Sequence, residues 1–250
     1  MIPKVIHYCW FGRNPLPRLA KKCIASWRKY LPDYEIKEWN EDNFDVNIIP
    51  YTREAYAAKK YAFVSDFARF RILNKYGGVY FDTDVEVLKP MDALIQSGAF
   101  MGMQNRLYNA NDRIEINAGL GLAAEAGSPV LIAIIDDYNS RHFIPFERRT
   151  DGRLETVVTI VTDVLYRFGL QDINDRQQVG DFIIYPADYF GSRQSVAFDI
   201  PRTENTYTIH HFAATWMPWH SKIRKRLRDA LPLSWSRAIS RTKHRLLRKK

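Results

Sequence analysis

The chain has 250 residues, of which 46% are hydrophobic, and its formal net charge is +9. That length allows one substantial hydrophobic core, and the 14 Tyr, 14 Phe and 6 Trp favour a globular protein over a disordered one. No stretch approaches the roughly 20 apolar residues of a membrane-spanning helix, and no secretory signal is visible. Cys9 and Cys23 lack a metal-ligand spacing, so we expect reduced structural thiols in a cytoplasmic protein.

The positive charge is concentrated near the C-terminal end. Residues 222–250 hold 12 Lys and Arg against one acidic residue, Asp229, whereas the other 221 residues hold 25 basic and 27 acidic residues. We therefore predict a nearly neutral globular domain over residues 1–219 and a basic amphipathic helical tail over residues 220–250. A basic nucleic-acid-binding protein would need a charged body as well as a charged tail, so this class is disfavoured.

The first elements in chain order predict a strand, a helix and a second strand. Residues 5–10 are apolar and strand-like, and residues 35–39 form a second strand after a Leu-Pro-Asp turn. Between them, Leu19, Cys23 and Trp27 recur at helical spacing. A strand, helix and strand within about 35 residues form a βαβ unit, which favours an α/β fold with a parallel sheet and covering helices.

The rest of the domain continues this alternation. Residues 53–76 are predicted to be helical, and Tyr61 is the place where a break would fall. Further helices are predicted over residues 91–97, 129–138 and 154–168, and further strands over residues 99–104, 116–122, 182–185 and 207–211.

The most informative segment, residues 76–87, has the sequence Tyr-Gly-Gly-Val-Tyr-Phe-Asp-Thr-Asp-Val-Glu-Val. Gly77 suits the left-handed position that closes a helix, and residues 79–81 favour a strand. Because side chains two apart on a strand share a face, we expect Asp82 and Asp84 to aim at one point. Two carboxylates there suit Mg2+ or Mn2+ carrying a diphosphate. The pattern indicates a nucleotide-sugar site; the alternative is a solvated polar strand end.

A charged pair lies in the helix that leads into this segment. Asp66 and Arg69 are three residues apart and share one helix face among apolar neighbours. A structural ion pair is the usual role of such buried charge. Arginine is also a good diphosphate ligand, because it stays charged and presents forked donors. Since the helix delivers the chain to Asp82 and Asp84, we favour a functional role for the pair.

Five segments together resemble family 32 of the glycosyltransferases, the group with a DXD-containing sugar-binding region. Its members include fungal Golgi mannosyltransferases, bacterial capsule and exopolysaccharide sugar transferases and, more distantly, large glucosylating toxins. The matching segments are residues 2–12 (IPKVIHYCWFG), 62–69 (AFVSDFAR), 76–84 (YGGVYFDTD), 117–119 (NAG) and 209–216 (IHHFAATW). They follow the order of the family, although Ala118 replaces a more usual Thr. The basic tail lies outside the resemblance.

The resemblance implies a GT-A fold, which is a Rossmann-like mixed sheet with helices on both faces. It also implies retaining transfer of a hexose from a UDP- or GDP-linked sugar with Mn2+ or Mg2+ as cofactor. The implied donor-binding residues are Trp10, Asp66, Arg69, Tyr80, Asp82, Asn117 and Trp216. The implied metal ligands are Asp82, Asp84 and His211, and Asp82, Asp84 and Arg69 are the implied catalytic residues.

Several of these residues also have a structural interpretation. Trp10 could pack in the core, although it ends a strand where open α/β sheets bind ligands. Tyr80 and Asn117 could serve packing and backbone hydrogen bonding. On a strand, His210 and His211 point to opposite faces, so only one can join the two aspartates, and we choose His211.

The predicted activity is hexose transfer to a glycan or lipid-linked saccharide in surface polysaccharide synthesis. The loops over residues 105–113 and 140–152 are the predicted acceptor side. The tail interleaves basic residues with Leu and Trp, which suits attachment to an anionic membrane surface at the inner face of the cytoplasmic membrane. A metal-dependent phosphohydrolase, a nucleic-acid-binding protein and a lectin-like sugar binder are the alternatives.

Overall fold

A computed structural model describes residues 1–104, 113–145, 155–190, 200 and 202–213. The strands are β1 (Val5–Cys9), β2 (Glu35–Trp39), β3 (Gly78–Tyr80), β4 (Val85–Val87), β5 (Phe100–Met103), β6 (Ile116–Ala124), β7 (Gln177–Val179), β8 (Phe182–Tyr185) and β9 (Thr208–His210). The helices are α1 (Arg18–Tyr30), α2 (Pro50–Ala57), α3 (Tyr61–Tyr76), α4 (Asp92–Gln96), α5 (Pro129–Asn139) and α6 (Val157–Arg167).

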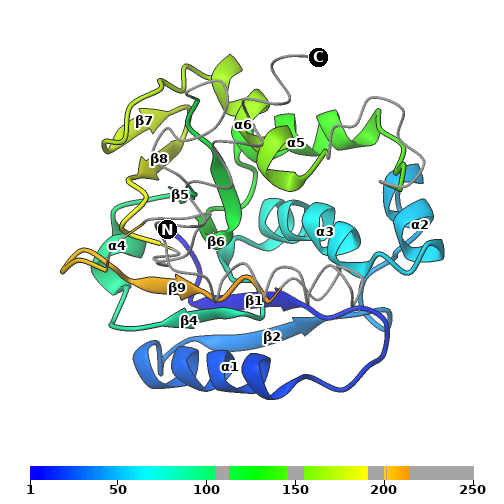
Figure 1. Cartoon of the computed structure of the whole chain (residues 1–250), viewed down its shortest axis with the longest axis horizontal. Helices are drawn as coiled ribbons and strands as arrows, with labels where there is room; N and C mark the ends of the chain where they lie inside the picture. The colour runs from blue at the N-terminus through cyan, green and yellow to red at the C-terminus, as the bar shows by residue number, and fades with distance from the viewer. Residues whose placement is uncertain (105–112, 146–154, 191–199, 201, 214–250) are drawn as a thin grey trace, which may run out of the picture.

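Within these residues a 7-stranded mixed sheet has the strand order β2-β1-β3-β6-β5-β8-β7, and a 2-stranded sheet pairs β4 with β9. β1 runs parallel to β2 and β3, and β5 runs parallel to β8. β6 lies antiparallel between β3 and β5, and β7 lies antiparallel to β8. Most strands of the sheet therefore run in the same direction, and the predicted α/β fold with a mixed sheet is confirmed (Figure 1).

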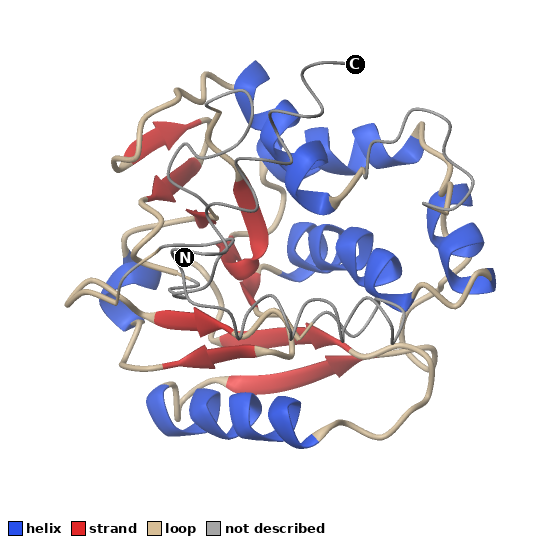
Figure 2. Ribbon diagram, in the orientation of Figure 1, coloured by secondary structure: helices blue, strands red, loops and turns tan. Residues whose placement is uncertain are grey.

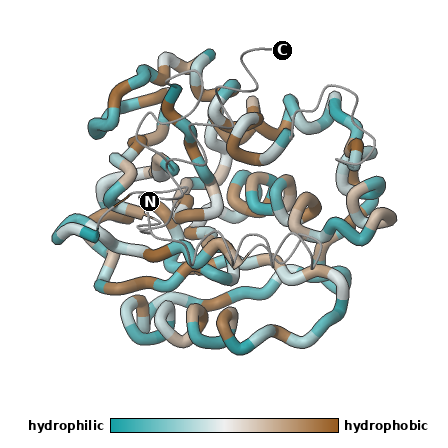
Figure 3. Tube along the Cα trace, viewed as in Figure 1, coloured by the Kyte–Doolittle hydropathy of each residue, from teal (hydrophilic) through white to brown (hydrophobic). Residues whose placement is uncertain are grey.

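The sheet separates two hydrophobic cores. On one face, Cys23 and Trp27 of α1 pack against Ile6 of β1 and Val79 of β3. On the other face, α2, α3, α5 and α6 form a larger core that includes Tyr80 (Figure 2). The hydropathy alternates along α1, because only one of its faces is buried (Figure 3). Helices thus cover both faces of the sheet, as predicted.

The predicted break in the helix before the aspartates is confirmed. α2 ends at Ala57 and α3 begins at Tyr61, with Lys59 in a left-handed conformation at φ 56°. At the other end of α3, Gly77 has φ 65° and its N–H donates to the carbonyl of Leu73. A Cβ on the next residue, Gly78, would lie 2.7 Å from the carbonyl oxygen of Val5. These two glycines let the chain leave the helix and enter β3 beside β1.

No helix in the described part of the chain is long and apolar enough to span a membrane. The predicted tail over residues 220–250, and with it the boundary at residue 219, lies outside the described residues. Both stay predictions.

His7 is a buried titratable residue with a purely structural environment. Its Nδ1 lies 3.0 Å from the indole Nε1 of Trp39, which only donates, so Nδ1 accepts and Nε2–H donates to the carbonyl of Gly77. Burial lowers the pKa of His7 to about 4, although the bond to Gly77 opposes this change. The neutral ring thus satisfies both neighbours.

We expect this histidine to make the protein acid-sensitive. The folded protein binds the His7 proton more weakly than the unfolded chain, so stability falls as the pH drops from 6.5 towards about 4. A shift of this size corresponds to about 3 kcal/mol. Urea unfolding between pH 7.5 and 4.5 should show a smaller loss in His7→Gln than in the native protein. Equal losses in both proteins would contradict this assignment.

Candidate active site

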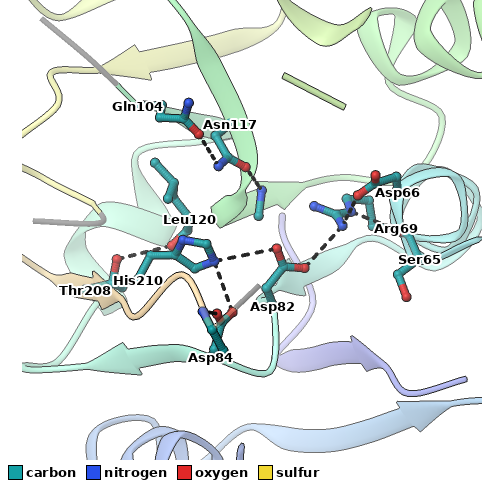
Figure 4. A network of polar contacts seen from close by, with 12 residues as sticks. Ser65, Asp66, Arg69, Asp82, Asp84, Gln104, Asn117, Leu120, Thr208 and His210 are labelled. Carbon is teal, nitrogen blue, oxygen red and sulfur yellow. Dashed lines mark hydrogen bonds and ion pairs between the residues drawn. The ribbon is translucent and has the colours of Figure 1, made fainter. Parts of the chain in front are cut away.

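The two aspartates of the motif lie in the connection between β3 and β4. Asp82 follows β3, Asp84 precedes β4, and the N–H of Val85 donates to the carbonyl of Asp82 at 2.9 Å. The expectation that both belong to one continuous strand was wrong, because the chain makes a turn at this point. The turn itself directs both carboxylates to one place (Figure 4).

Buried contacts from α1 hold the turn in place. The indole N–H of Trp27 donates to the carbonyl of Val85 at 2.8 Å, and the N–H of Val87 donates to Ser26 Oγ at 3.0 Å. From the opposite side, the N–H of Asp82 lies 3.3 Å from the carbonyl oxygen of Gly119 on β6. Both ends of the turn are thereby tied to regular elements.

β9 brings a histidine to the aspartates from a distant part of the sequence. His210 Nε2 lies 3.0 Å from Asp84 Oδ1 and 3.9 Å from Asp82 Oδ2. The backbone N–H of Ala213 donates to Asp84 Oδ2 at 2.7 Å. The hydroxyl of Thr208 also donates to the carbonyl of Leu120, which fixes β9 against β6 (Figure 4). Asp82, Asp84 and His210 therefore form one cluster.

The structure brings His210, and not the predicted His211, to the two aspartates. In the antiparallel register of β4 with β9, His210 is opposite Val85 and shares its buried face. His211 belongs to the other face, where its Nε2 lies 2.9 Å from Glu86 Oε2. The reasoning that only one histidine can reach the aspartates holds. The register that decides between the two histidines comes from pairing across more than a hundred residues.

Arg69 joins the cluster from α3. Its side chain is only 2% exposed, and its Nη2 lies 2.6 Å from Asp66 Oδ1 and 3.2 Å from Asp82 Oδ1. Its guanidinium carbon lies 4.8 Å from the ring centre of Tyr80, whose hydroxyl donates to Asp82 Oδ1 at 3.2 Å. Its Nη1 is buried and has no hydrogen-bond partner within the described residues. The structure thus brings together five of the predicted residues (Asp66, Arg69, Tyr80, Asp82 and Asp84) and leaves one guanidinium nitrogen without a partner among the described residues.

The carboxylates differ in their electrostatic environments. Burial raises the pKa of Asp66 to about 7, against the opposing effect of Arg69. Burial also raises the pKa of Asp82, although Arg69 and His210 oppose it. For Asp84, burial is outweighed by His210 and by the N–H of Ala213, which lower its pKa to about 2. Asp84 therefore stays ionised at neutral pH, and a cation would relieve the buried charge on Asp82.

Hydrogen bonds around Asn117 and Gly119 of β6 support Asp82 from a second side. The sequence predicted only Asn117 among these residues. Asn117 Oδ1 accepts from the N–H of Gly119 at 2.8 Å, and Asn117 Nδ2 donates to Gln104 Oε1 at 2.7 Å. A Cβ on Gly119 would lie 2.0 Å from Asp82 Oδ2. Gly119 and Gln104 were missed as site residues. A glycine in an otherwise apolar strand was the available signal for Gly119, because such glycines permit close approach.

The cluster fits a divalent cation. Asp82, Asp84 and His210 each offer one ligand atom, and these atoms lie within 4.8 Å of one another. Two carboxylate oxygens and one imidazole nitrogen form a donor set suited to Mn2+ and acceptable to Mg2+. Asp84 also keeps its negative charge at neutral pH, as a metal ligand must.

Comparison with known protein families also identifies the segment that contains the two aspartates. Residues 17–101, which include α1, α3 and both aspartates, match the family model described as "Glycosyltransferase sugar-binding region containing DXD motif". Over this segment the chain is similar to this glycosyltransferase family. It is 32% identical over 111 residues to inositol phosphoceramide mannosyltransferase 1 of Schizosaccharomyces pombe, covering 40% of this chain and 33% of that protein.

A second curated relative matches over a longer stretch. Mannosyl phosphorylinositol ceramide synthase CSH1 of Saccharomyces cerevisiae is 28% identical over 196 residues, covering 76% of this chain and 49% of that protein. The chain thus spans a third to a half of the length of these two relatives.

Solved glycosyltransferase structures are also similar to this chain. The PaToxG glycosyltransferase has a TM-score of 0.47 at 19% identity, covering 66% of this chain and 69% of that chain. The galactosyltransferase LgtC, in complex with donor and acceptor sugar analogs, has a TM-score of 0.44 at 14% identity, covering 92% and 98%.

Trp10 lies at the same edge of the sheet as the aspartates, because it follows β1 and β1 runs parallel to β3. It lines a polar cavity of about 240 Å³ together with Arg13, Asn14, Glu38, Asn40 and Glu41. The indole N–H donates to the carbonyl of Asn14 at 2.5 Å, and the ring is partly exposed. The aspartates do not line this cavity, so a donor contact from Trp10 stays a prediction.

Of two other predicted donor-binding residues, Tyr80 is described by the structure and Trp216 is not. Tyr80 is 1% exposed and supports Arg69 and Asp82 from within the protein. Trp216 lies outside the described residues, as do most of the predicted acceptor loops over residues 105–113 and 140–152. Their roles stay predictions.

Proposed function

We propose that this protein is a metal-dependent, retaining glycosyltransferase that moves a hexose from a UDP- or GDP-linked sugar to a saccharide acceptor. The cluster of Asp82, Asp84 and His210 carries this proposal, because its three donor atoms suit a cation and its two aspartates lie in the segment that matches the DXD family model. The other support is Arg69, whose buried positive charge adjoins the same cluster.

The proposed metal ligands are Asp82, Asp84 and His210. When bound, Mn2+ or Mg2+ would neutralise negative charge on the leaving diphosphate. The protein's own contribution is a fixed arrangement: the Ala213 N–H and His210 orient the Asp84 carboxylate, and Arg69 and Tyr80 orient that of Asp82. Preorganised groups of this kind need no rearrangement when charge develops.

Arg69 and Asp66 are proposed to contact the donor. The unpartnered Nη1 of Arg69 offers a buried, permanently charged donor for a phosphate or sugar oxygen. Asp66 has a pKa near 7, so it can accept from or donate to a sugar hydroxyl around neutral pH. The sequence identifies no covalent nucleophile, so we propose front-face transfer. The acceptor hydroxyl would form the new glycosidic bond as the bond to phosphate breaks, and its proton would pass to the leaving phosphate.

The acceptor is proposed to be a glycan or a lipid-linked saccharide in surface polysaccharide synthesis. The names of the curated relatives describe mannosyl transfer to inositol phosphoceramide, a lipid with a phosphoinositol headgroup. This supports a hexose and a membrane-associated acceptor. We propose that the basic residues of the tail hold the enzyme at an anionic membrane surface on the cytoplasmic side. Replacing residues 224–226 and 248–250 by Gln should reduce sedimentation with phosphatidylglycerol vesicles and leave transfer to a water-soluble acceptor unchanged.

A donor panel tests the function. Thermal unfolding with Mn2+ and each of several UDP- and GDP-sugars should show stabilisation by one donor, and that donor should then support sugar transfer to a saccharide acceptor. Hydrolysis of the donor that never depends on an acceptor would favour a phosphohydrolase instead. Sugar binding that needs neither nucleotide nor metal would favour a lectin-like protein.

The metal ligands are tested by matched variants. We expect Asp84→Asn and His210→Ala to weaken Mn2+ binding, measured by calorimetry without donor, and to reduce transfer at least about 100-fold, since they remove charge stabilisation at the leaving group. Asp136→Asn changes an exposed acid on α5 and is the control that should keep both properties. Unchanged Mn2+ affinity in Asp84→Asn would contradict the assignment.

A further inference from the structure

A second charged cluster lies behind the metal site. It consists of Lys22 on α1, Glu86 on β4 and His211 just after β9, and we name it the Glu86 clamp. Lys22 Nζ and His211 Nε2 each lie 2.9 Å from the same carboxylate oxygen, Glu86 Oε2. The Glu86 side chain is 20% exposed, whereas that of Lys22 is 61% exposed. The clamp therefore joins three segments that are remote in sequence through one partly shielded carboxylate.

The direction of these hydrogen bonds follows from charge. Burial alone would raise the pKa of Glu86, but its bonds to Lys22 and His211 lower it below the ordinary value. The carboxylate is therefore ionised at neutral pH and can only accept. It follows that His211 Nε2 carries a hydrogen and donates it to Glu86. A positively charged or neutral His211 can make the same bond, so the contact needs no change of protonation.

Residues 210–213, at the end of β9 and just after it, contact Asp84 through backbone N–H groups and one imidazole. The N–H of His211 donates to the carbonyl of Asp84 at 2.9 Å, while His210 Nε2 and the Ala213 N–H hold its two carboxylate oxygens. Between these residues Phe212 has φ 47°, a left-handed conformation that bulky residues rarely adopt. Its ring packs edge-on against His210 at 4.0 Å between ring centres.

This geometry shows why the segment needs support. Strand pairing ends at His210, so the turn through Phe212 that points the Ala213 N–H back at Asp84 is not part of a ladder. Strained backbone persists only where neighbouring contacts determine it. His211 is the residue at which the chain leaves β9, and Glu86 holds its side chain against β4, the strand that begins directly after Asp84.

We propose that Glu86 is a positioning residue for the metal site: by holding His211, it fixes the turn over residues 210–213 and so sets the geometry of Asp84 and His210. This inference rests on the proposed metal-dependent function. Glu86 itself lies on the opposite face of β4 and does not join the metal ligands. Residues beyond the ligands that fix their orientation commonly change metal affinity by about 10-fold to 100-fold when removed.

The test is Mn2+ titration calorimetry of the full chain without donor. We expect Glu86→Ala to weaken Mn2+ binding about tenfold. Glu86→Gln retains an oxygen acceptor for His211 and should restore most of the affinity. In transfer assays, Glu86→Ala should need more Mn2+ for half-maximal activity but recover most of the native kcat at saturating Mn2+. A purely structural loss would lower kcat at every Mn2+ concentration. Asp163→Ala, which breaks the exposed pair with Arg113, is the control and should bind Mn2+ normally.

A double-mutant cycle tests the route through His211. If Glu86 acts through His211, then Glu86→Ala and His211→Ala should weaken Mn2+ binding by less together than the product of their separate effects. Multiplicative effects, or native Mn2+ affinity in folded Glu86→Ala, would overturn the inference. Glu86→Gln serves if Glu86→Ala fails to fold. If Glu86 acts only through His211, Glu86→Gln cannot weaken Mn2+ binding more than His211→Ala does. A larger loss of Mn2+ affinity in Glu86→Gln would therefore also overturn the inference. The wild type separates the two hypotheses: no Mn2+ binding there would refute the proposed function too, whereas normal binding with an indifferent Glu86 refutes the clamp alone.

Discussion

Replacing Arg69 with Met is expected to destabilise the protein by about 3–5 kcal/mol, because it leaves buried carboxylates without their partner. Arg69 is 2% exposed and lies 2.6 Å from Asp66 and 3.2 Å from Asp82. Met keeps most of the apolar stem, so the loss comes from charge and hydrogen bonds. The bond from Arg69 Nε to the carbonyl of Ser65 is lost as well. Urea unfolding at pH 7.5 measures the effect.

Two further variants separate charge from packing. Asp66→Asn added to Arg69→Met removes one uncompensated carboxylate and should restore part of the lost stability. Arg71→Met lies on the same helix but is exposed, and it should change stability by less than about 0.5 kcal/mol. If Arg71→Met costs as much as Arg69→Met, the buried pair does not explain the loss. In the folded fraction of Arg69→Met, donor affinity should fall even with Mn2+ at saturation.

The fold and one side of the site were predictable because they depend on local patterns. Helical spacing identified α1 and α3, and a separation of three residues placed Asp66 and Arg69 on one face of α3, where they form an ion pair. The succession of strand, helix and strand between Val5 and Trp39 predicted a βαβ unit, and β1 and β2 are indeed parallel. Burial of these elements on both sides of the sheet confirms the predicted layers.

The other side of the site depends on contacts that no local pattern encodes. The aspartates converge through a turn held by Trp27 and Gly119, which lie far from them in the chain. The selection of His210 over His211 follows from the register of β9 on β4, and alternation alone leaves both choices open. β4 and β7, each three residues long, were not predicted as separate strands. Short strands gain their stability from neighbours, so their sequences carry a weak signal.

Replacing Gly119 with Ala is expected to weaken Mn2+ binding at least about 100-fold while leaving the fold intact, because the new methyl group collides with Asp82, one of the proposed metal ligands. The added Cβ would lie 2.0 Å from Asp82 Oδ2 and 3.0 Å from Asn117 Oδ1. A carbon atom cannot lie 2.0 Å from a carboxylate oxygen to which it is not bonded, so the Asp82 carboxylate must turn away from Asp84 and His210. The backbone at Gly119 does not have a positive φ, so alanine itself fits the strand.

Gly121→Ala is the matched control on the same strand, β6. Its added Cβ would meet Phe190 Cδ1 at 3.2 Å and Phe81 Cε1 at 3.6 Å, so it crowds an aromatic ring and no carboxylate. We expect it to cost about 1 kcal/mol or more in stability through overpacking and to keep native Mn2+ affinity, measured by the same calorimetric titration. Thermal unfolding of both variants separates folding from binding. Weakened Mn2+ binding in Gly121→Ala equal to that in Gly119→Ala would show that any methyl group on β6 disturbs the site. Selective loss in Gly119→Ala would instead locate the requirement at the contact with Asp82, since both substitutions add the same methyl group to the same strand.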